Sequence, residues 1–453
     1  MAFKAREFVI DQEDIFKNDR LSRIEEVKNL SLLLTNITAP IVLSVNAPWG
    51  TGKTAFLKML HAHIESTGSS AIYFSAWETD FANDPLLAFL GEMNEEVSKI
   101  INGNSRKQDA WNRAKQAGSY IVNKVPTALE ALPVVGDLAG EMAGDIIDRY
   151  VKNKSEIERF KTNIKSLLTD KKGKHQKLYV FIDELDRCRP TYAIEFFERI
   201  KHILDIEGVV FVLAMDKEQL SHSVKAIYGD DFESIGYLKR FIDIEYILIK
   251  PELDKFIDQL YDTFGFNAFF EARSKFKEFE HDASHLKSVF KVIANAKNYS
   301  LRDIEQLMAR INLVILTTKE NVYLYPALLT LLLATKESDP EVYQDYINPK
   351  SMPNKMINHF HHLVPEQERL GSFSCALIEA QILGPKEENT GNIYEQHIAN
   401  VRNKSTDDPA RKYSADIVWL VENSHEGRLG FVDLKHLVSR IELIEKFNFS
   451  EEE

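Results

Sequence analysis

The residues whose types and spacing best suit chemistry are Lys53 and Thr54, which follow two glycines in the run WGTGKT. Such glycines let backbone N–H groups close around phosphate oxygens at the start of a helix, where a lysine can reach the β- and γ-phosphates. A threonine beside that lysine can ligate Mg²⁺. The run matches the second half of the P-loop pattern G-x-x-x-x-G-K-[ST], although Ala47 replaces the first glycine. We therefore predict a triphosphate-binding loop made of Pro48, Trp49, Gly50, Thr51, Gly52, Lys53, Thr54 and Ala55.

A second candidate is the carboxylate pair Asp183 and Glu184, which follows the apolar run LYVFI at 178–182. Parallel strands end at the phosphate crevice, so an acidic pair there can meet both the metal ion and the attacking water. Asp183 would hold Mg²⁺ together with Thr54, and Glu184 would accept a proton from water. Each motif alone could be a turn after a buried strand, but their order along the chain favours a P-loop followed by a Walker B motif.

These residues need parallel strands that end at one edge of a sheet and a helix that begins after the glycines. Apolar, β-branched runs predict five strands, at 41–45, 71–74, 178–182, 208–215 and 241–249. After Pro251 the apolar residues follow helical spacing. The fold predicted is α/β, with a parallel-sheet core and a mostly α-helical C-terminal half. Its expected parts are a core at 1–250 with a helical insert at about 100–176, a lid-like helical subdomain at 251–345 and a C-terminal helical region at 346–453.

The composition is that of a globular protein, with 44% hydrophobic and 28% charged residues among 453. The 56 basic and 69 acidic residues give a net charge of −13, which provides no overall attraction for nucleic acid. Two cysteines argue against a disulfide framework. Charges such as Lys124, Glu130 and Asp137 interrupt the insert far short of the ~20 apolar residues that a membrane span needs. We expect a cytoplasmic protein with neither membrane span nor secretory leader.

Four other stretches carry expectations. Residues 13–36 have helical spacing, with Asp19 as a cap, and residues 102–108 are polar and read as a loop. The lysine-rich stretch 171–177 is interpreted as a solvated loop rather than a nucleic-acid contact. The polar stretch 384–412 is expected to be a loosely packed excursion. Histidines without partners at metal-ligand spacing are expected to be exposed on a helix, namely His359, His361 and His362.

Over about residues 14–345 the sequence resembles the KAP family of P-loop NTPases. The blocks that carry the resemblance are WGTGKT at 49–54, FSAW at 74–77, IDELDRCRP at 182–190, FVLAMDKEQL at 211–220 and YLKRFIDIEYIL at 237–248. The resemblance implies a core of the additional-strand (ASCE) type followed by a helical segment. It also implies that membrane helices often lie between the two motifs, a pattern from which this chain departs. Bacterial members of the family are frequently linked to phage exclusion.

Three further site residues come from related NTPases. Asp216, at the end of a predicted strand, resembles a position that senses the γ-phosphate, and it could equally cap the next helix. An arginine often completes the charge around the γ-phosphate, supplied by a lid or by a neighbouring copy. Arg302 is the candidate on the helical segment, and Arg240 is the first candidate for action between copies. An ordinary surface arginine is the alternative for both.

The function predicted is Mg²⁺-dependent nucleoside triphosphate hydrolysis, most simply of ATP, coupled to a conformational change and linked to anti-phage defence. Protein partners or a homo-oligomer are expected. The alternative is a nucleotide-gated scaffold that binds ATP, assembles with partners and hydrolyses little. The acidic balance disfavours a nucleic-acid-remodelling ATPase. It does not exclude a local basic patch, so nucleic acid as a partner stays open.

Overall fold

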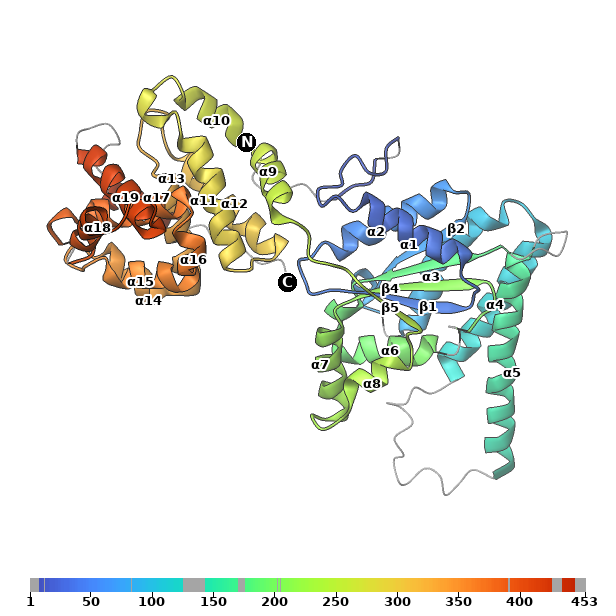
Figure 1. Ribbon diagram of the computed structural model, residues 1–453. Helices are drawn as coiled ribbons and strands as arrows, with labels where there is room; N and C mark the ends of the chain where they lie inside the picture. Colours follow the sequence, from blue (N-terminus) through green and yellow to red (C-terminus); the bar gives the residue numbers. More distant parts are fainter. Residues whose placement is uncertain are drawn as a thin grey trace. The chain divides into compact units, whose positions relative to one another are not determined.

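The computed structural model describes residues 8–11, 13–82, 84–124, 143–169, 176–201, 203, 205–389, 392–425 and 434–444. The chain divides into two compact units (Figure 1). The first unit spans Phe8–Pro251 and contains every strand described, and the second begins at Glu252 and is helical. The further division of the second unit near residue 345 stays a prediction.

The first unit is built on a five-stranded sheet in which every pairing is parallel. The strand order is β2-β3-β4-β1-β5. In chain order the strands are β1 (Ile41–Asn46), β2 (Ser70–Ser75), β3 (Leu178–Asp183), β4 (Val209–Met215) and β5 (Ile244–Ile247). Because β4 lies between β1 and β3, one additional strand separates the P-loop strand from the strand that carries the acidic pair. The predicted α/β fold with an additional-strand core is confirmed.

Successive residues of a strand point into two apolar cores, one on each face of the sheet. On β1, Ile41, Leu43 and Val45 belong to the core beneath the first pair of helices, and Val42 belongs to the opposite core. Burial on both faces explains why these strands read as continuous apolar runs. Helices α1 (Ile24–Asn36) and α2 (Lys53–Ser66) cover one face. The other core takes residues from α3 (Pro85–Ile101), α4 (Ser105–Lys124), α5 (Ala143–Leu168), α6 (Pro190–Ile200), α7 (Lys217–Tyr228) and α8 (Ser234–Lys239).

The insert between the two motifs contributes the neighbouring helices α4 and α5 (Figure 1). The buried side chains Trp111 and Phe160 anchor them to the core beside α3. The expected loop at 102–108 is shorter than predicted, because the side chain of Asn104 accepts hydrogen bonds from the N–H groups of Arg106 and Lys107 and so begins α4 early. The lysine-rich prediction at 171–177 falls mostly outside the described residues. Lys177 itself donates to the carbonyls of Leu34, Thr35 and Ile37 near the end of α1.

The second unit packs its helices around α13 (Pro326–Ser338), which is buried on nearly all sides. A proline at its first turn suits the start of a helix, where no N–H partner is needed. Helices α11, α12, α14 and α17 contact α13. The remaining helices are α9 (Leu253–Thr263), α10 (Phe266–Arg273), α11 (Asp282–Ala296), α12 (Leu301–Leu316), α14 (Pro340–Ile347), α15 (Asn354–Leu363), α16 (Glu366–Arg369), α17 (Phe373–Leu383), α18 (Asn392–Asn403), α19 (Pro409–His425) and α20 (Leu434–Ile444).

Two expectations about this unit are wrong. The stretch 384–412 is not a loose excursion, since it forms a 3₁₀ turn at Gly384–Asn389, all of α18 and the start of α19. Of the three histidines, only His362 is exposed, and His361 bonds the carboxylate of Glu379. No group of three His, Cys, Asp or Glu side chains in the described part of the chain could hold a metal ion. Nor does any helix described here have the length and apolar character to cross a membrane.

Candidate nucleotide site

The P-loop joins β1 to α2 and relies on two glycines in the left-handed region. Gly50 has φ of 72° and Gly52 has φ of 87°, and a side chain at either position would strain the backbone. Ala47 is not among the described residues with positive φ, which shows that it does not share this conformation. Its small side chain is buried in the core beneath α2. The departure from the glycine pattern at Ala47 therefore leaves the shape of the loop intact.

The side chain of Lys53 reaches back to the start of the P-loop. Its Nζ donates to the carbonyl oxygen of Ala47 at 2.7 Å and lies 3.3 Å from that of Pro48. The same Nζ lies 3.4 Å from Oδ2 of Asp186. The ammonium group is therefore held at the start of the P-loop by two carbonyl groups and one carboxylate.

The two predicted metal ligands meet at the end of β3. Asp183 is 1% exposed, and its side chain lies near that of Thr54. Its Oδ2 accepts from the hydroxyl group of Tyr73 at 2.7 Å, and its Oδ1 accepts from the N–H of Glu184 at 2.8 Å. Burial raises the pKa of Asp183, with a smaller contribution from the charge of Glu184. A bound cation would offset that cost, and a hydroxyl with a carboxylate is a set of hard oxygen donors that suits Mg²⁺.

Glu184 follows directly and adopts a left-handed conformation, with φ of 62° and ψ of 21°. Its Oε2 accepts from the hydroxyl of Ser75 at 2.9 Å. Its Oε1 lies 2.9 Å from Nη1 of Arg187. The carboxylate therefore stands beside the metal ligand, as predicted, but both oxygens already have partners. Each oxygen keeps a second lone pair, and the side chain is 17% exposed, so a water molecule can still donate to Glu184.

Asp216 lies at the end of β4 and contacts two elements at once. Its Oδ1 accepts from the N–H groups of Glu218 and Gln219 at 3.1 and 3.2 Å, which caps α7. Its Oδ2 accepts from the backbone N–H of Trp49 at 3.2 Å. The cap and a direct link to the P-loop are thus combined in one carboxylate.

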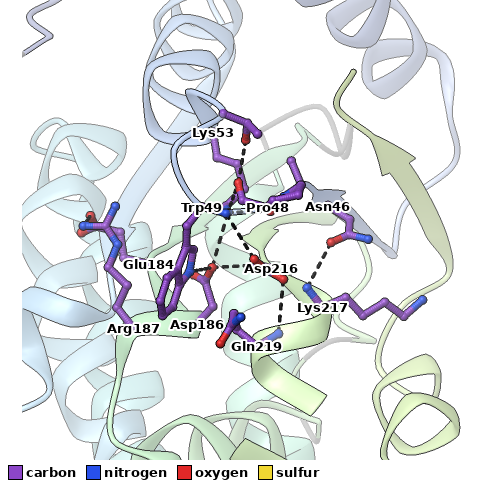
Figure 2. A network of polar contacts seen from close by, with 12 residues as sticks. Asn46, Pro48, Trp49, Lys53, Glu184, Asp186, Arg187, Asp216, Lys217 and Gln219 are labelled. Atoms are coloured by element: carbon purple, nitrogen blue, oxygen red, sulfur yellow. Dashed lines mark hydrogen bonds and ion pairs between the residues drawn. The ribbon is translucent and has the colours of Figure 1, made fainter. Parts of the chain in front are cut away.

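Asp186 is the site residue that the sequence analysis missed. Its Oδ2 accepts from the indole Nε1 of Trp49 at 2.7 Å and from the N–H of Asp216 at 2.9 Å, in addition to its contact with Lys53 (Figure 2). The sequence alone suggests pairs between Asp186 and the nearby arginines. Instead, Arg187 pairs with Glu184 and Arg189 pairs with Asp80.

The available signal was the spacing of three residues between Asp183 and Asp186. The 3₁₀ helix at Leu185–Arg187 folds that short distance back toward the same edge of the sheet.

The two candidate arginine fingers belong to different units of the chain. Arg240 is exposed and ends α8, ahead of Asp243, whose N–H pairs with the carbonyl of Val42 near the amino end of β1. The P-loop follows the opposite, carboxyl end of β1. Arg302 is exposed in the first turn of α12, in the second unit. Neither arginine has an ion-pair partner within the described ranges.

Comparison with known proteins gives a family and several remote likenesses. Residues 23–317 match the KAP family P-loop domain. The Phage T7 exclusion protein of Escherichia coli K12 is 20% identical over 246 residues, which are 51% of this chain and 33% of that protein. The chain thus spans about a third of the length of that curated relative.

Three solved structures show fainter similarity. The Aeropyrum pernix ORC1 protein in complex with DNA is 12% identical, with 93% of this chain and 92% of that chain covered and a TM-score of 0.33. The ORC2 protein of the same organism, in ADPNP-ADP complexes, is 10% identical, with 89% and 95% covered and a TM-score of 0.35. AMPPCP-bound DnaA from Aquifex aeolicus is 12% identical, with 85% and 96% covered and a TM-score of 0.24. Scores of this size carry no argument about function.

Proposed function

This chain belongs to the KAP family of P-loop domains, and on that premise we propose that it is a Mg²⁺-dependent ATPase whose hydrolysis drives a conformational change. The observation that carries the proposal is the buried carboxylate of Asp183, which lies near Thr54 where β3 ends beside the P-loop. That pair places a hydroxyl and a carboxylate beside the loop that contains Lys53. A role in anti-phage defence is part of the proposal, supported by the name of the relative from Escherichia coli.

The chain's own residues divide the work of hydrolysis. The amides of the P-loop and the ammonium of Lys53 bind and orient the phosphates. Thr54 and Asp183 would hold Mg²⁺, which supplies positive charge to the β- and γ-phosphate oxygens when bound. Glu184 orients a water molecule and accepts its proton, while Ser75 and Arg187 hold its carboxylate in place.

Lys53→Ala tests the binding part of this proposal. The substitution should weaken Mg-ATP binding by at least about tenfold, because it deletes a charge-assisted contact to the triphosphate. Isothermal titration calorimetry measures the change. Lys58→Ala, on the same helix α2, is the matched control and should bind as the parent does. Equal affinity of Lys53→Ala and the parent would contradict the P-loop assignment.

Glu184→Gln, measured with the same preparation, tests the hydrolytic part. Its amide keeps the shape of the side chain but cannot accept a proton, so phosphate release should fall by ~10²- to 10⁴-fold with ATP binding retained. Glu78→Gln, an exposed carboxylate in the 3₁₀ helix after β2, should hydrolyse at the parental rate. Hydrolysis by Glu184→Gln at the parental rate would remove Glu184 from the mechanism.

A nucleotide-gated scaffold is the second candidate function. The observation that favours it is the ion pair between Glu184 and Arg187, which engages the carboxylate that hydrolysis would require. A parent protein that binds Mg-ATP but releases no phosphate would support the scaffold and contradict the ATPase.

A further inference from the structure

Asp186 is a buried carboxylate at the edge of the sheet that carries the P-loop. Its side chain is 2% exposed, and a single oxygen, Oδ2, contacts the side chains of Trp49 and Lys53 and the backbone of Asp216. Figure 2 shows these groups converging on it from three segments of the chain. A carboxylate removed from water to this degree is costly unless it has both a cation and hydrogen-bond donors. Lys53 is the cation that the structure provides.

The distances around Lys53 differ in a way that matters for phosphate binding. Its Nζ is 2.7 Å from the carbonyl oxygen of Ala47, which is an ordinary hydrogen bond, but 3.4 Å from Oδ2 of Asp186. The second distance is that of an ion pair and is long for a hydrogen bond. An ammonium group has three N–H donors, and the carbonyls of Ala47 and Pro48 use at most two. Asp186 therefore attracts the ammonium by charge and leaves a donor for a phosphate oxygen.

Trp49 links Asp186 to the backbone of the P-loop. Its indole N–H is anchored on Asp186 and its backbone N–H on Asp216, so the residue is held at both ends. The ring is nevertheless 49% exposed, so burial contributes little to holding it. The two carboxylates thus fix the part of the P-loop that precedes Gly50.

We infer that Asp186 is a positioning residue for phosphate binding, which holds Lys53 and Trp49 in the geometry that receives the triphosphate. The inference rests on the proposed function and deepens it. A positioning role for Asp186 predicts an effect on ATP affinity that a purely structural role does not. With Lys53 present, Asp186 balances a cation and orients it; without Lys53, Asp186 is an unbalanced buried negative charge close to the phosphates.

The test is a cycle of Asp186→Asn in the parent and in the Lys53→Ala background, with Mg-ATP affinity measured by calorimetry. Asparagine keeps the size and one acceptor oxygen but removes the charge. In the parent, Asp186→Asn should weaken binding by at least about threefold, because Lys53 and Trp49 lose the carboxylate that positions them, and this loss outweighs the reduced repulsion of the phosphates. In the Lys53→Ala background, the same substitution should tighten binding by at least about threefold, because it removes repulsion. Asp80→Asn, which breaks the pair with Arg189 and does not touch the P-loop, should leave affinity unchanged in both backgrounds.

Each outcome decides between readings. A loss in both backgrounds, or no change in either, would overturn the inference while leaving the ATPase proposal in place. A parent protein that binds ATP without hydrolysing it would contradict the ATPase and leave the cycle measurable, and a parent that does not bind ATP would contradict both. If Asp186→Asn does not fold, as judged by thermal unfolding, Trp49→Phe replaces it. That variant removes one donor to Asp186 and should weaken Mg-ATP binding, and parental affinity would overturn the inference.

Discussion

Glu184 has the most unusual backbone among the residues of the site. A residue other than glycine in the left-handed region costs on the order of 1 kcal/mol or more, and persists only where its surroundings hold it. Here the hold comes from Ser75 and Arg187 on the side chain and from Asp183 on the N–H. The strain therefore lies at the residue to which we assign the proton transfer from water. Its contacts with Ser75 and Arg187 fix the direction of its carboxylate.

At the residue scale, the sequence predicted the parts of the site that are contiguous along the chain. The P-loop, Asp183 and Glu184 form short local patterns, and the structure brings them together. Asp186 escaped prediction because its partners Trp49 and Asp216 lie 137 and 30 residues away. No local spacing records those distances. A carboxylate beside two arginines instead suggested that Asp186 pairs with Arg187 or Arg189, but these arginines pair with Glu184 and Asp80.

His285 on α11 provides a pH dependence with a definite sign. Burial, with a smaller contribution from the charge of His281, lowers the pKa of His285 to about 4 from an ordinary value near 6.5. Between these values the unfolded chain binds a proton that the folded chain does not. The titration of His285 therefore costs no stability above about pH 6.5. Below that pH, the free energy of unfolding falls as the pH drops toward 4.

His285→Gln should accordingly reduce the loss of Tm between pH 7 and pH 5, measured by thermal unfolding. His362→Gln, at an exposed histidine, should keep the parental dependence. The same loss of Tm in His285→Gln and the parent would show that His285 does not titrate in this way.

At the scale of elements, the strands were predicted well and the ends of several helices were not. Strands buried on both faces are apolar throughout, so β1, β3 and β4 could be predicted from composition. The helix predicted at 13–36 begins only at Ile24. Ser22 has φ of 56°, which breaks a helix, and the carboxylate of Asp19 accepts from the N–H groups of Leu21 and Ile24. Asp19 does cap the start of α1, but across a turn rather than from within a longer helix.

The misread stretch 384–412 is explained by one buried carboxylate. Glu379 on α17 is fully buried, and its two oxygens contact His361 on α15 and His397 on α18 at 3.0 Å each. Tyr413 on α19 donates to it at 2.7 Å. Burial alone would raise the pKa of Glu379, but the hydrogen bonds with the two histidines outweigh burial and hold the pKa well below its usual range. One polar residue of the stretch, His397, is thus a partner for this charge, and its contact holds α18 against α17.

Glu379→Ala should therefore destabilise the second unit by about 3 kcal/mol, because it leaves His361, His397 and Tyr413 without their shared partner. Urea denaturation measures the free energy of unfolding. Glu379→Gln retains hydrogen-bonding capacity and should lose less, and Glu366→Ala, at an exposed carboxylate on α16, should change the stability little. A loss below 1 kcal/mol in Glu379→Ala would show that these four helices do not depend on the cluster.

At the scale of the whole molecule, the position of Arg240 bears on assembly. Within one chain Arg240 lies toward the amino ends of the strands, and the P-loop lies at their carboxyl ends. A second copy of the chain could present Arg240 to a P-loop that its own copy does not reach. Arg240→Ala should lower phosphate release by ~10³-fold if it supplies the finger. Lys239→Ala, at the neighbouring exposed cation, is the control.

Mixing experiments separate action between copies from action within one chain. An Arg240→Ala subunit mixed with a Glu184→Gln subunit should recover part of the lost turnover, since each copy supplies what the other lacks. Turnover per subunit that stays constant over a hundredfold dilution, together with no recovery on mixing, would exclude the arrangement between copies. Arg302 would then be the remaining candidate.

The pairing of β1 determines when this strand can join the sheet during translation. β1 has β4 and β5 as its neighbours, with Ile41 opposite Val210 and Leu43 opposite Ile244. Both partners are synthesised well over a hundred residues after β1, so during translation the strand that carries the P-loop emerges long before anything it pairs with. Contacts so distant in sequence make folding slow, and they leave an apolar strand exposed to aggregation in the meantime. The nucleotide site is therefore among the last parts of the first unit to form on the ribosome, although its defining motif is among the first to be translated.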